Sequence, residues 1–344
     1  MRSLIFGAGA IGSYLGGQLA AAGADVTLLA RGAQHEALSR EGLTISWPDG
    51  RKQHVKVNAC RPGEAQGTFD IVFVTLKSMQ IAAVAADINS LLSPSGVMVM
   101  IQNGLPWWYF EGVDSPLRGK RLACLDPDGA LARSIDLSRV IGAVIYKPVM
   151  VTAPGQLFIP PFKAERLVIG ELDNRVSARA RDIAALVSNA GLPCEVTDDI
   201  RLAKWAKLIS NLVWNPLCAL TQSTSGHIAA LPGGAELVRQ LMREGEAVAR
   251  AAGVPLTADI DGELARVHGN FSQQPSMMQD IRAGRAMEID AILNAVIEMA
   301  DLTGVAVPAL RNIAACVSLL DQRVRSDGVA IVPLRTAVAG SANA

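Results

Sequence analysis

The chain has 344 residues, half of them hydrophobic, and its 32 lysine and arginine residues balance 32 aspartate and glutamate residues. This length favours two domains and is enough to bury a sizeable core. Because the formal net charge is zero, the chain has no field to attract nucleic acid or an acidic membrane. We therefore expect neither as a partner.

The cysteines and histidines argue against a metal centre. The five cysteines form no CxxC pair and do not cluster with the four histidines: Cys60, Cys124, Cys194, Cys218, Cys316, His35, His54, His227 and His268. We expect no metal, no disulfide framework and a cytoplasmic location. The uncharged stretch between Arg2 and Asp25 superficially resembles an export signal, but its six glycines favour another role.

The first part of the chain alternates strand and helix patterns. The apolar run 3–6, a glycine-rich turn, an amphipathic stretch at 13–23 and a second apolar run at 25–31 predict a βαβ unit. Buried strands are predicted at 69–77 and 96–104, with a helix at 80–92 between them. Continuous apolar strands separated by helices are typical of a parallel sheet that is covered on both faces.

Further elements complete this domain before the pattern changes. Strands are predicted at 139–151, 155–159, 166–170 and 194–198, with a helix at 177–191. From residue 198 nearly every segment has helical periodicity: 200–220, 234–253, 276–284, 288–304 and 309–324. The sequence thus predicts an α/β domain at 1–197 and an all-α domain at 198–344, with a loose tail at 340–344.

The glycine loop comprises Gly7, Ala8, Gly9, Ala10, Ile11 and Gly12. Glycines at this spacing allow a tight turn and a close approach of the backbone to a pyrophosphate. The free N–H groups of the following helix would face the phosphate charge. Because the loop connects a strand to a helix, we interpret it as a dinucleotide site, with a purely structural tight turn as the alternative.

The end of the second predicted strand indicates which cofactor binds. An NAD site commonly has an acidic residue there, which holds the ribose hydroxyls. This chain instead has Arg31, followed by Gln34 and His35. A guanidinium suits a 2′-phosphate, so NADP is favoured over NAD. The alternative is that Arg31 is a solvated surface residue.

Two polar residues follow the next predicted strands. Lys77 comes after one apolar run and Asn103 after the next. The carboxyl ends of strands in an open α/β sheet line the ligand crevice, so both are candidates for the cofactor side of a cleft. Either one alone would also be unremarkable as a loop residue.

The predicted helix at 200–220 carries Lys207, Asn211 and Asn215 at steps of four, which places them on one face. A lysine among apolar neighbours has a lowered pKa and is suited to donate a proton to a ketone oxygen during hydride transfer. The two amides are suited to bind substrate. The alternative is an exposed polar stripe. Pro216 is expected to kink the helix.

A second candidate pair is Ser276 and Glu288. An unbroken helix would hold them about 18 Å apart, too far to share a small ligand. Gly284 offers a break that would bring them together. Glu288 could then orient Lys207 or accept a hydrogen bond from the substrate. Ser276 with Gln279 also fits a helix capping box, which is the structural alternative.

In their order along the chain, these features resemble the ketopantoate reductase (2-dehydropantoate 2-reductase) family. The resemblance covers about Met1 to Leu320 and rests on the glycine loop, Arg31, "TLK" at 75–77, "QNG" at 102–104, "WAKLISNLVWNPL" at 205–217 and "SMMQD…EID" at 276–290. It implies a Rossmann-type domain with a parallel sheet joined to a helical domain, an active site between them, and a homodimer.

The resemblance also implies residue roles in the NADPH-dependent reduction of ketopantoate to pantoate, on the pathway to pantothenate and coenzyme A. Lys207 would be the general acid, and Asn103, Asn211, Asn215 and Ser276 substrate binders. The cofactor residues would be Gly7 to Gly12, Arg31, Lys77 and Asn103. Glu288 would partner the substrate or the cofactor. A related β-hydroxyacid or opine-type dehydrogenase, or a non-catalytic NADP sensor, is the alternative.

The segment after "QNG" departs from the family pattern. It contains Trp107, Trp108, Tyr109 and Phe110 in succession. These aromatic residues could form a hydrophobic lid, a dimer contact or ordinary loop packing. Because a lid would reshape the pocket, another branched 2-oxo acid remains a possible substrate.

Overall fold

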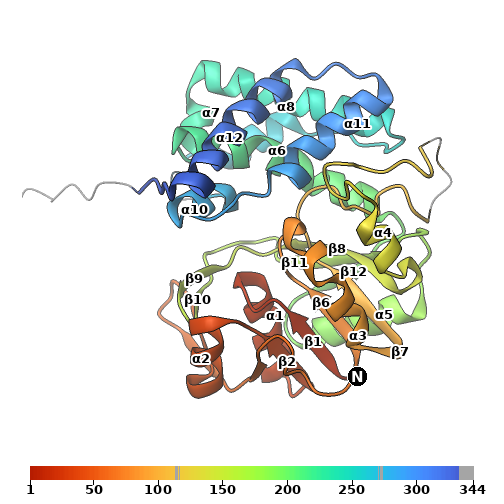
Figure 1. Ribbon diagram of the computed structural model, residues 1–344. Helices are drawn as coiled ribbons and strands as arrows, with labels where there is room; N and C mark the ends of the chain where they lie inside the picture. The colour runs from red at the N-terminus through yellow and green to blue at the C-terminus, as the bar shows by residue number, and fades with distance from the viewer. Residues whose placement is uncertain (113–114, 116, 270, 272–273, 333–344) are drawn as a thin grey trace, which may run out of the picture.

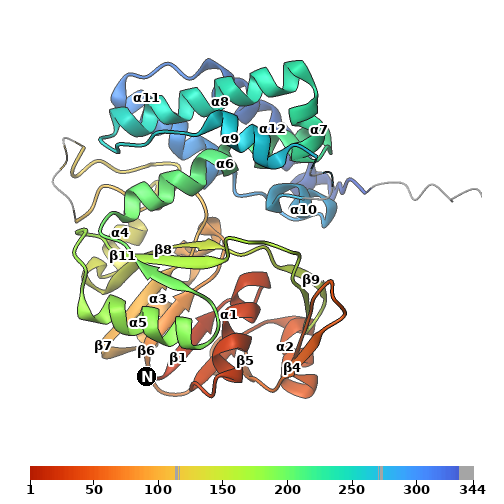
Figure 2. The same ribbon diagram turned by 180° about the vertical axis from the view of Figure 1, so that it is seen from behind.

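The computed structural model describes residues 1–112, 115, 117–269, 271 and 274–332. The tail at 340–344 lies outside the described residues. A sheet domain packs against a helical domain, and α6 (Ile200–Thr221) leads from one into the other (Figures 1 and 2). Within the described residues, no helix combines the length and apolarity needed to cross a membrane.

The sheet domain is built on eight strands in the order β12-β11-β8-β7-β6-β1-β2-β5. Across the part of the sheet with the order β8-β7-β6-β1-β2-β5, every pair of neighbouring strands is parallel, as expected for a Rossmann-type sheet. The strands of this sheet are β1 (Ser3–Phe6), β2 (Val26–Leu29), β5 (Asn58–Cys60), β6 (Phe69–Val74), β7 (Leu92–Met100), β8 (Val140–Tyr146), β11 (Arg166–Glu171) and β12 (Cys194–Val196).

Helices cover both faces of this sheet because its central strands are apolar on both sides. One apolar cluster joins the sheet to α1 (Ala10–Ala21) and α5 (Ala178–Asn189). A second cluster lies on the opposite face, under α3 (Ala85–Ser90) and α4 (Ala130–Ser134). The predicted parallel α/β arrangement is therefore confirmed.

The sheet differs from the prediction at one edge. β8 and β11 are antiparallel, since the connection between them contains a small sheet rather than a crossover helix. The predicted strand 139–151 is accordingly two strands, β8 and β9, which flank Lys147 and Pro148. The small sheet has the order β4-β3-β10-β9: β3 (Leu43–Ser46), β4 (Lys52–Val55), β9 (Met150–Ala153) and β10 (Gln156–Phe158).

The helix predicted at 80–92 is mostly tight turns. It comprises the 3-10 helices η1 (Ser78–Gln80) and η2 (Ala82–Val84), followed by α3. The Gln80 side chain accepts a hydrogen bond from the Lys77 N–H, which closes the first turn after three residues. The remaining small helices of this domain are α2 (Gly32–Glu41) and η3 (Leu137–Arg139).

The helical domain surrounds α6, which packs against α8, α10 and α12 and also contacts α7 and η4. Asp199 caps α6 by accepting from the Leu202 N–H at 2.9 Å. The helix runs past Pro216 and ends at Thr221, so Pro216 does not end it. The other helices are α7 (Ser225–Ala230), α8 (Pro232–Ala251), α9 (Ile260–Val267), α10 (Ser276–Arg282), the π-helix η4 (Asp290–Asn294), α11 (Ala295–Thr303) and α12 (Pro308–Asp327).

The aromatic residues 107–110 pack into the cores of both domains. All four side chains are buried, with Trp107 and Trp108 in the apolar cluster under α3 and α4, and Tyr109 and Phe110 in the core of the helical domain. The indole of Trp205 donates to the Tyr109 hydroxyl at 2.8 Å. The loop-packing interpretation is therefore correct. A lid and a dimer contact are wrong, because neither fits side chains buried within one chain.

Candidate active site

The glycine loop joins β1 to α1 with the geometry of a phosphate cradle. Gly7 has φ +115°, and a Cβ on Gly12 would lie 2.2 Å from the Gly7 carbonyl oxygen. A Cβ on Gly9 would have no described neighbour within 4 Å, so this residue borders open space. Since α1 begins at Ala10, its first N–H groups face that space. The loop fits a dinucleotide pyrophosphate.

Arg31 lies two residues after the end of β2 and is exposed at the N-cap of α2. No carboxylate pairs with it within the described part of the chain. Gln34, by contrast, binds the protein itself: its amide donates to Ser13 Oγ at 3.1 Å and accepts from the Gly155 N–H at 2.9 Å. Arg31 is therefore the residue of this segment that fits a 2′-phosphate.

Lys207 lies on α6 at the carboxyl ends of β7 and β8. Its ammonium donates to Asn103 Oδ1 at 2.8 Å and to the Ile145 carbonyl at 2.5 Å. The ring of Tyr146 lies 5.7 Å from the same nitrogen. Lys207 is half-buried, so the exposed-stripe interpretation is wrong for this residue. An ammonium has three donors, and two are used by these contacts.

Asn103 connects Lys207 to Glu288. The Asn103 Nδ2 donates to Glu288 Oε2 at 3.5 Å, and Glu288 Oε1 accepts from the Ser78 N–H at 3.2 Å. The hydrogen bonds of Glu288 within the described residues thus run to Asn103 and Ser78 rather than directly to Lys207. Gly284, with φ +62°, supplies the predicted break after α10 and allows Glu288 to reach this position.

Lys77 turns toward the helical domain. Its ammonium forms an ion pair with Asp280 at 2.7 Å and donates to the Ala286 carbonyl at 2.7 Å. Asp280 is buried and also pairs with Arg285 at 3.2 Å. Lys77 is therefore at the strand end where the sequence placed it, with a partner that the sequence did not reveal.

Burial controls the protonation of the site. Removal from water lowers the pKa of Lys207 to about 8, and the charge of Glu288 opposes that shift. Burial raises the pKa of Glu288 above its usual range. Sequence reasoning missed Lys204, one turn before Lys207, whose pKa is lowered to about 7 by burial and by the Lys207 charge. Its spacing of three from Lys207 was the available signal.

The predicted substrate residues lie along and beside α6. Asn215 is buried, and its Nδ2 has no hydrogen-bond partner within the described part of the chain. Asn211 is half-buried one turn nearer to Lys207. Ser276 is exposed at the first position of α10, which packs on α6. Because Pro275 holds the cap position, the capping-box interpretation of Ser276 is wrong.

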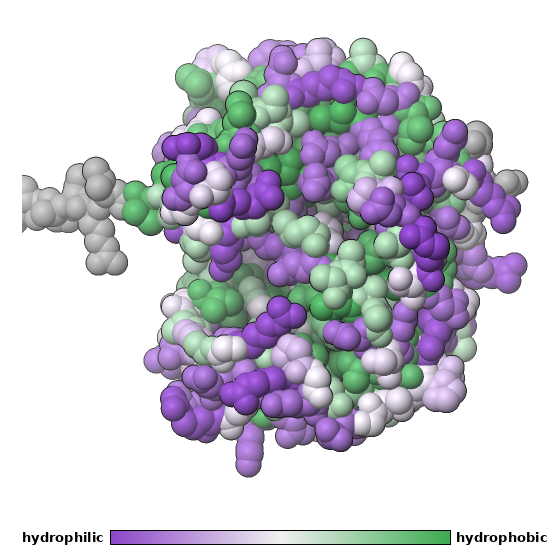
Figure 3. Space-filling view, in the orientation of Figure 1, coloured by the Kyte–Doolittle hydropathy of each residue, from purple (hydrophilic) through white to green (hydrophobic). Residues whose placement is uncertain are grey.

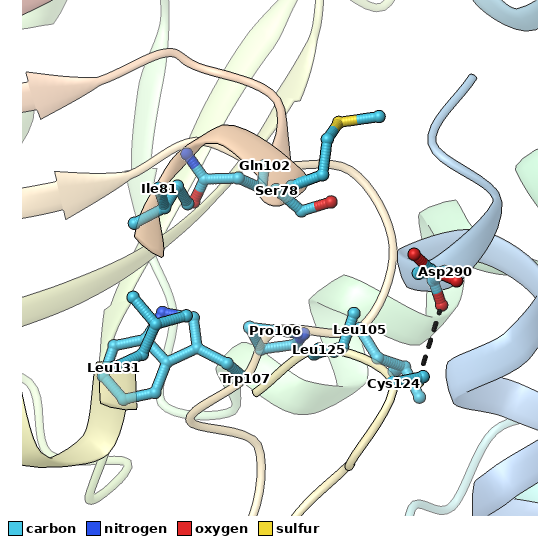
Figure 4. A pocket seen from close by; sticks show the side chains of 11 residues that line it. Ser78, Ile81, Gln102, Leu105, Pro106, Trp107, Cys124, Leu125, Leu131 and Asp290 are labelled. Atoms are coloured by element: carbon cyan, nitrogen blue, oxygen red, sulfur yellow. Dashed lines mark hydrogen bonds between the residues drawn. The ribbon is translucent and has the colours of Figure 1, made fainter. Parts of the chain in front are cut away.

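A hollow separates the two domains on the face shown in Figure 3, below α10. A small pocket is lined in part by Gln102 (Figure 4). Ser78, Ile81 and Gln102 line one side of it, and Leu105, Pro106, Trp107 and Leu125 the other. Lys207 is not among the residues that line it, so this pocket is separate from the proton donor.

Two family models match the chain. The model described as "Ketopantoate reductase PanE/ApbA" matches residues 3–106, and the one described as "Ketopantoate reductase PanE/ApbA C terminal" matches residues 199–321. The first covers the glycine loop, Arg31, Lys77 and Asn103. The second begins where α6 begins and covers Lys207 and Glu288.

Named relatives span almost the whole chain. A 2-dehydropantoate 2-reductase from Mesorhizobium japonicum is 39% identical over 93% of this chain and 98% of its own length. The crystal structure of a PanE/ApbA family ketopantoate reductase from Ralstonia eutropha JMP134 is 31% identical, has a TM-score of 0.78 and covers 94% and 99% of the two chains. A dimeric ketopantoate reductase from Staphylococcus aureus, 22% identical with a TM-score of 0.72 over 94% and 100%, shares the fold.

Proposed function

The chain belongs to the ketopantoate reductase family, and from that membership we propose that it reduces 2-dehydropantoate (ketopantoate) to pantoate with NADPH. The observation that carries this proposal is the ammonium of Lys207, held at the domain interface by Asn103 and Ile145. A proton donor fixed beside the strand ends is what reduction of a ketone needs. The reaction belongs to the synthesis of pantothenate and coenzyme A.

The cofactor assignment rests on the glycine loop and Arg31. The loop borders open space at Gly9, and Arg31, just after β2, has no carboxylate partner among the residues that the structure describes. When bound, NADPH supplies the hydride. Gly7 to Gly12 would hold its pyrophosphate, and Arg31 would hold its 2′-phosphate. Lys77, Asn103 and Glu288 lie on the side of the cleft where the nicotinamide end would rest.

Lys207 supplies the proton of the reaction. As the carbonyl carbon of the substrate gains a hydride, its C–O π electrons move onto oxygen and form an alkoxide. The N–H of Lys207 that Asn103 and Ile145 do not use transfers its proton to that oxygen, which leaves a neutral amine and a 2-hydroxy acid. Because burial lowers the pKa of Lys207 to about 8, the amine releases this proton more readily than an exposed lysine would.

Asn211, Asn215 and Ser276 bind the substrate in this proposal. The buried Nδ2 of Asn215 lacks a protein partner among the described residues, and a substrate carboxylate or hydroxyl would satisfy it. Glu288 fixes Asn103 and accepts from the Ser78 N–H, so it acts on the proton donor through Asn103.

A steady-state assay tests the proposal. The purified protein is mixed with NADPH and, in parallel, with ketopantoate, with larger branched 2-oxo acids, and with a 2-oxo acid plus an amino acid. Oxidation of 3-hydroxy acids is tested with NADP⁺, and NADPH absorbance is followed throughout. We expect the highest kcat/KM with ketopantoate. A preference for a larger 2-oxo acid would keep the reaction class and change the substrate. Tight NADPH binding without turnover of any carbonyl would favour the sensor interpretation.

We also propose that the protein works in the cytoplasm as a homodimer. All five cysteines are free thiols, which fits a reducing compartment. The helical domain leaves several large apolar side chains exposed, among them Leu231 and Leu319, that a second copy would cover. Light scattering after gel filtration tests this, and a mass of one chain at micromolar concentration would contradict it.

A further inference from the structure

We propose that Lys204 is a positioning residue for proton transfer, which holds the Gln102–Asn103 peptide so that the Asn103 side chain meets Lys207. This inference rests on the proposed function of Lys207. Lys204 is 3% exposed, and its ammonium donates to the Gln102 carbonyl at 2.6 Å. That carbonyl belongs to the peptide bond that leads into Asn103.

The two lysines of α6 hold consecutive residues. Lys204 binds the main chain of Gln102, while Lys207 binds the side chain of Asn103. A separation of three residues places both on one face of the helix. Helix α6 thus holds the segment after β7 through two adjacent residues, Gln102 and Asn103. The bond to Asn103 is the one that orients the ammonium of Lys207.

Other contacts hold the same segment from its remaining sides. The Gln102 amide donates to the Val74 carbonyl at 2.8 Å, at the end of the neighbouring strand β6. The Leu105 N–H donates to the Ala291 carbonyl of η4 at 2.8 Å. Lys204 is the contact through which α6 holds the main chain of this segment, whereas Lys207 binds the Asn103 side chain. Without the Lys204 contact, the Gln102 carbonyl is left buried and the peptide is free to rotate.

Electrostatics favour a positioning role for Lys204 over a second proton donor. Lys207 on the same helix and Glu288 beside Asn103 are the charged groups that act on it. Burial first, and then the Lys207 charge, lower the pKa of Lys204 to about 7. Loss of this proton would leave the positioning role intact, because a neutral amine still donates to the Gln102 carbonyl.

The test uses three variants of the full chain: Lys204→Met, Asn103→Ala and the double variant. Methionine keeps the length and apolar volume of the lysine stem, so we expect NADPH affinity close to that of the parent and a folded protein whose Tm is lowered by the loss of one buried hydrogen bond. We expect Lys204→Met to lower kcat about tenfold or more, with a smaller change in KM, because misplacement of a catalytic group acts on the transition state. Lys204→Gln, which retains a donor, should recover part of that loss.

The double variant separates positioning from a general structural role. If Lys204 acts through Asn103, Lys204→Met will add little to the loss caused by Asn103→Ala. Retention of kcat within about twofold in Lys204→Met, or effects of the two changes that multiply fully, would overturn the inference.

Failure of the proposed function would look different, since the parent itself would then turn over no 2-oxo acid. In that case, NMR exchange of the Asn103 side-chain amide protons still tests the positioning. Faster exchange in Lys204→Met supports it, and unchanged exchange contradicts it.

Discussion

Asn103 accepts a hydrogen bond from Lys207 at 2.8 Å, although the two residues lie in different domains. The same carboxamide donates to Glu288, so one side chain joins the proposed proton donor to the nearby carboxylate. These two hydrogen bonds fix the orientation of the amide, because its oxygen must face the Lys207 ammonium and its nitrogen must face the Glu288 carboxylate.

Replacement of Asn103 tests this bridge. We expect Asn103→Ala to lower kcat about a hundredfold, because the ammonium of Lys207 loses a partner that aims it. The Kd for NADPH, measured by fluorescence titration, should change by a smaller factor than kcat does. Asn103→Asp adds a negative charge beside Lys207 and should raise the pKa of the lysine instead. Parent-like turnover in Asn103→Ala would remove Asn103 from the mechanism.

The pH dependence of kcat reports the protonation of Lys207. The proton donor is active in its charged form, so kcat should fall as the pH rises through about 8. The charge of Glu288 raises the pKa of Lys207, and Glu288→Gln should therefore move this loss of rate to lower pH. The measurement is a pH–rate profile under saturating NADPH. A shift to higher pH in Glu288→Gln would contradict the electrostatic account.

Arg31 should control the choice between the two nicotinamide cofactors. We expect Arg31→Ala to weaken NADPH binding by about 10- to 100-fold, because the 2′-phosphate loses a charged, bidentate partner. NADH lacks that phosphate, so its affinity is the internal control and should change little. Equal losses for both cofactors would mean that Arg31 supports the fold rather than the phosphate.

Gly104 allows the closest approach of the two domains in this region. It has φ +78°, and a Cβ there would lie 2.1 Å from the Ala291 carbonyl oxygen. We expect Gly104→Ala to destabilise the protein by about 3 kcal/mol or more in denaturant unfolding. Gly119 has the same φ of +78° with no described neighbour within 4 Å of a Cβ. Gly119→Ala should therefore cost only about 1 kcal/mol. Equal losses would show that backbone conformation alone matters.

The sequence predicted the parts of the site that local patterns encode. The glycine loop, Arg31 and Lys77 each lie at the end of a continuous apolar strand, and such strands are recognisable without knowledge of their neighbours. Lys207 was identifiable because it, Asn211 and Asn215 interrupt an otherwise apolar helical sequence at intervals of four residues, which places the three side chains on one face.

Contacts between distant segments could not be predicted in this way. The ion pair of Lys77 with Asp280 and the bond from Lys204 to Gln102 depend on how α6 and α10 dock on the sheet. The small four-stranded sheet was also missed in part, since β4 is polar and largely exposed and gives a weak strand signal. The burial of all four residues from Trp107 to Phe110 likewise follows from the packing of the helical domain on the sheet domain. A local sequence pattern does not predict such packing.

Hydride transfer in a single turnover by Lys207→Ala tests the central claim most directly. NADPH absorbance is followed after rapid mixing of the NADPH-bound enzyme with ketopantoate, and Lys56→Ala, which removes an exposed lysine, is the matched control. We expect NADPH affinity to be preserved in both variants and the oxidation of NADPH to be lost in Lys207→Ala alone. A Lys207→Ala enzyme that oxidises NADPH at the parent rate would contradict the account.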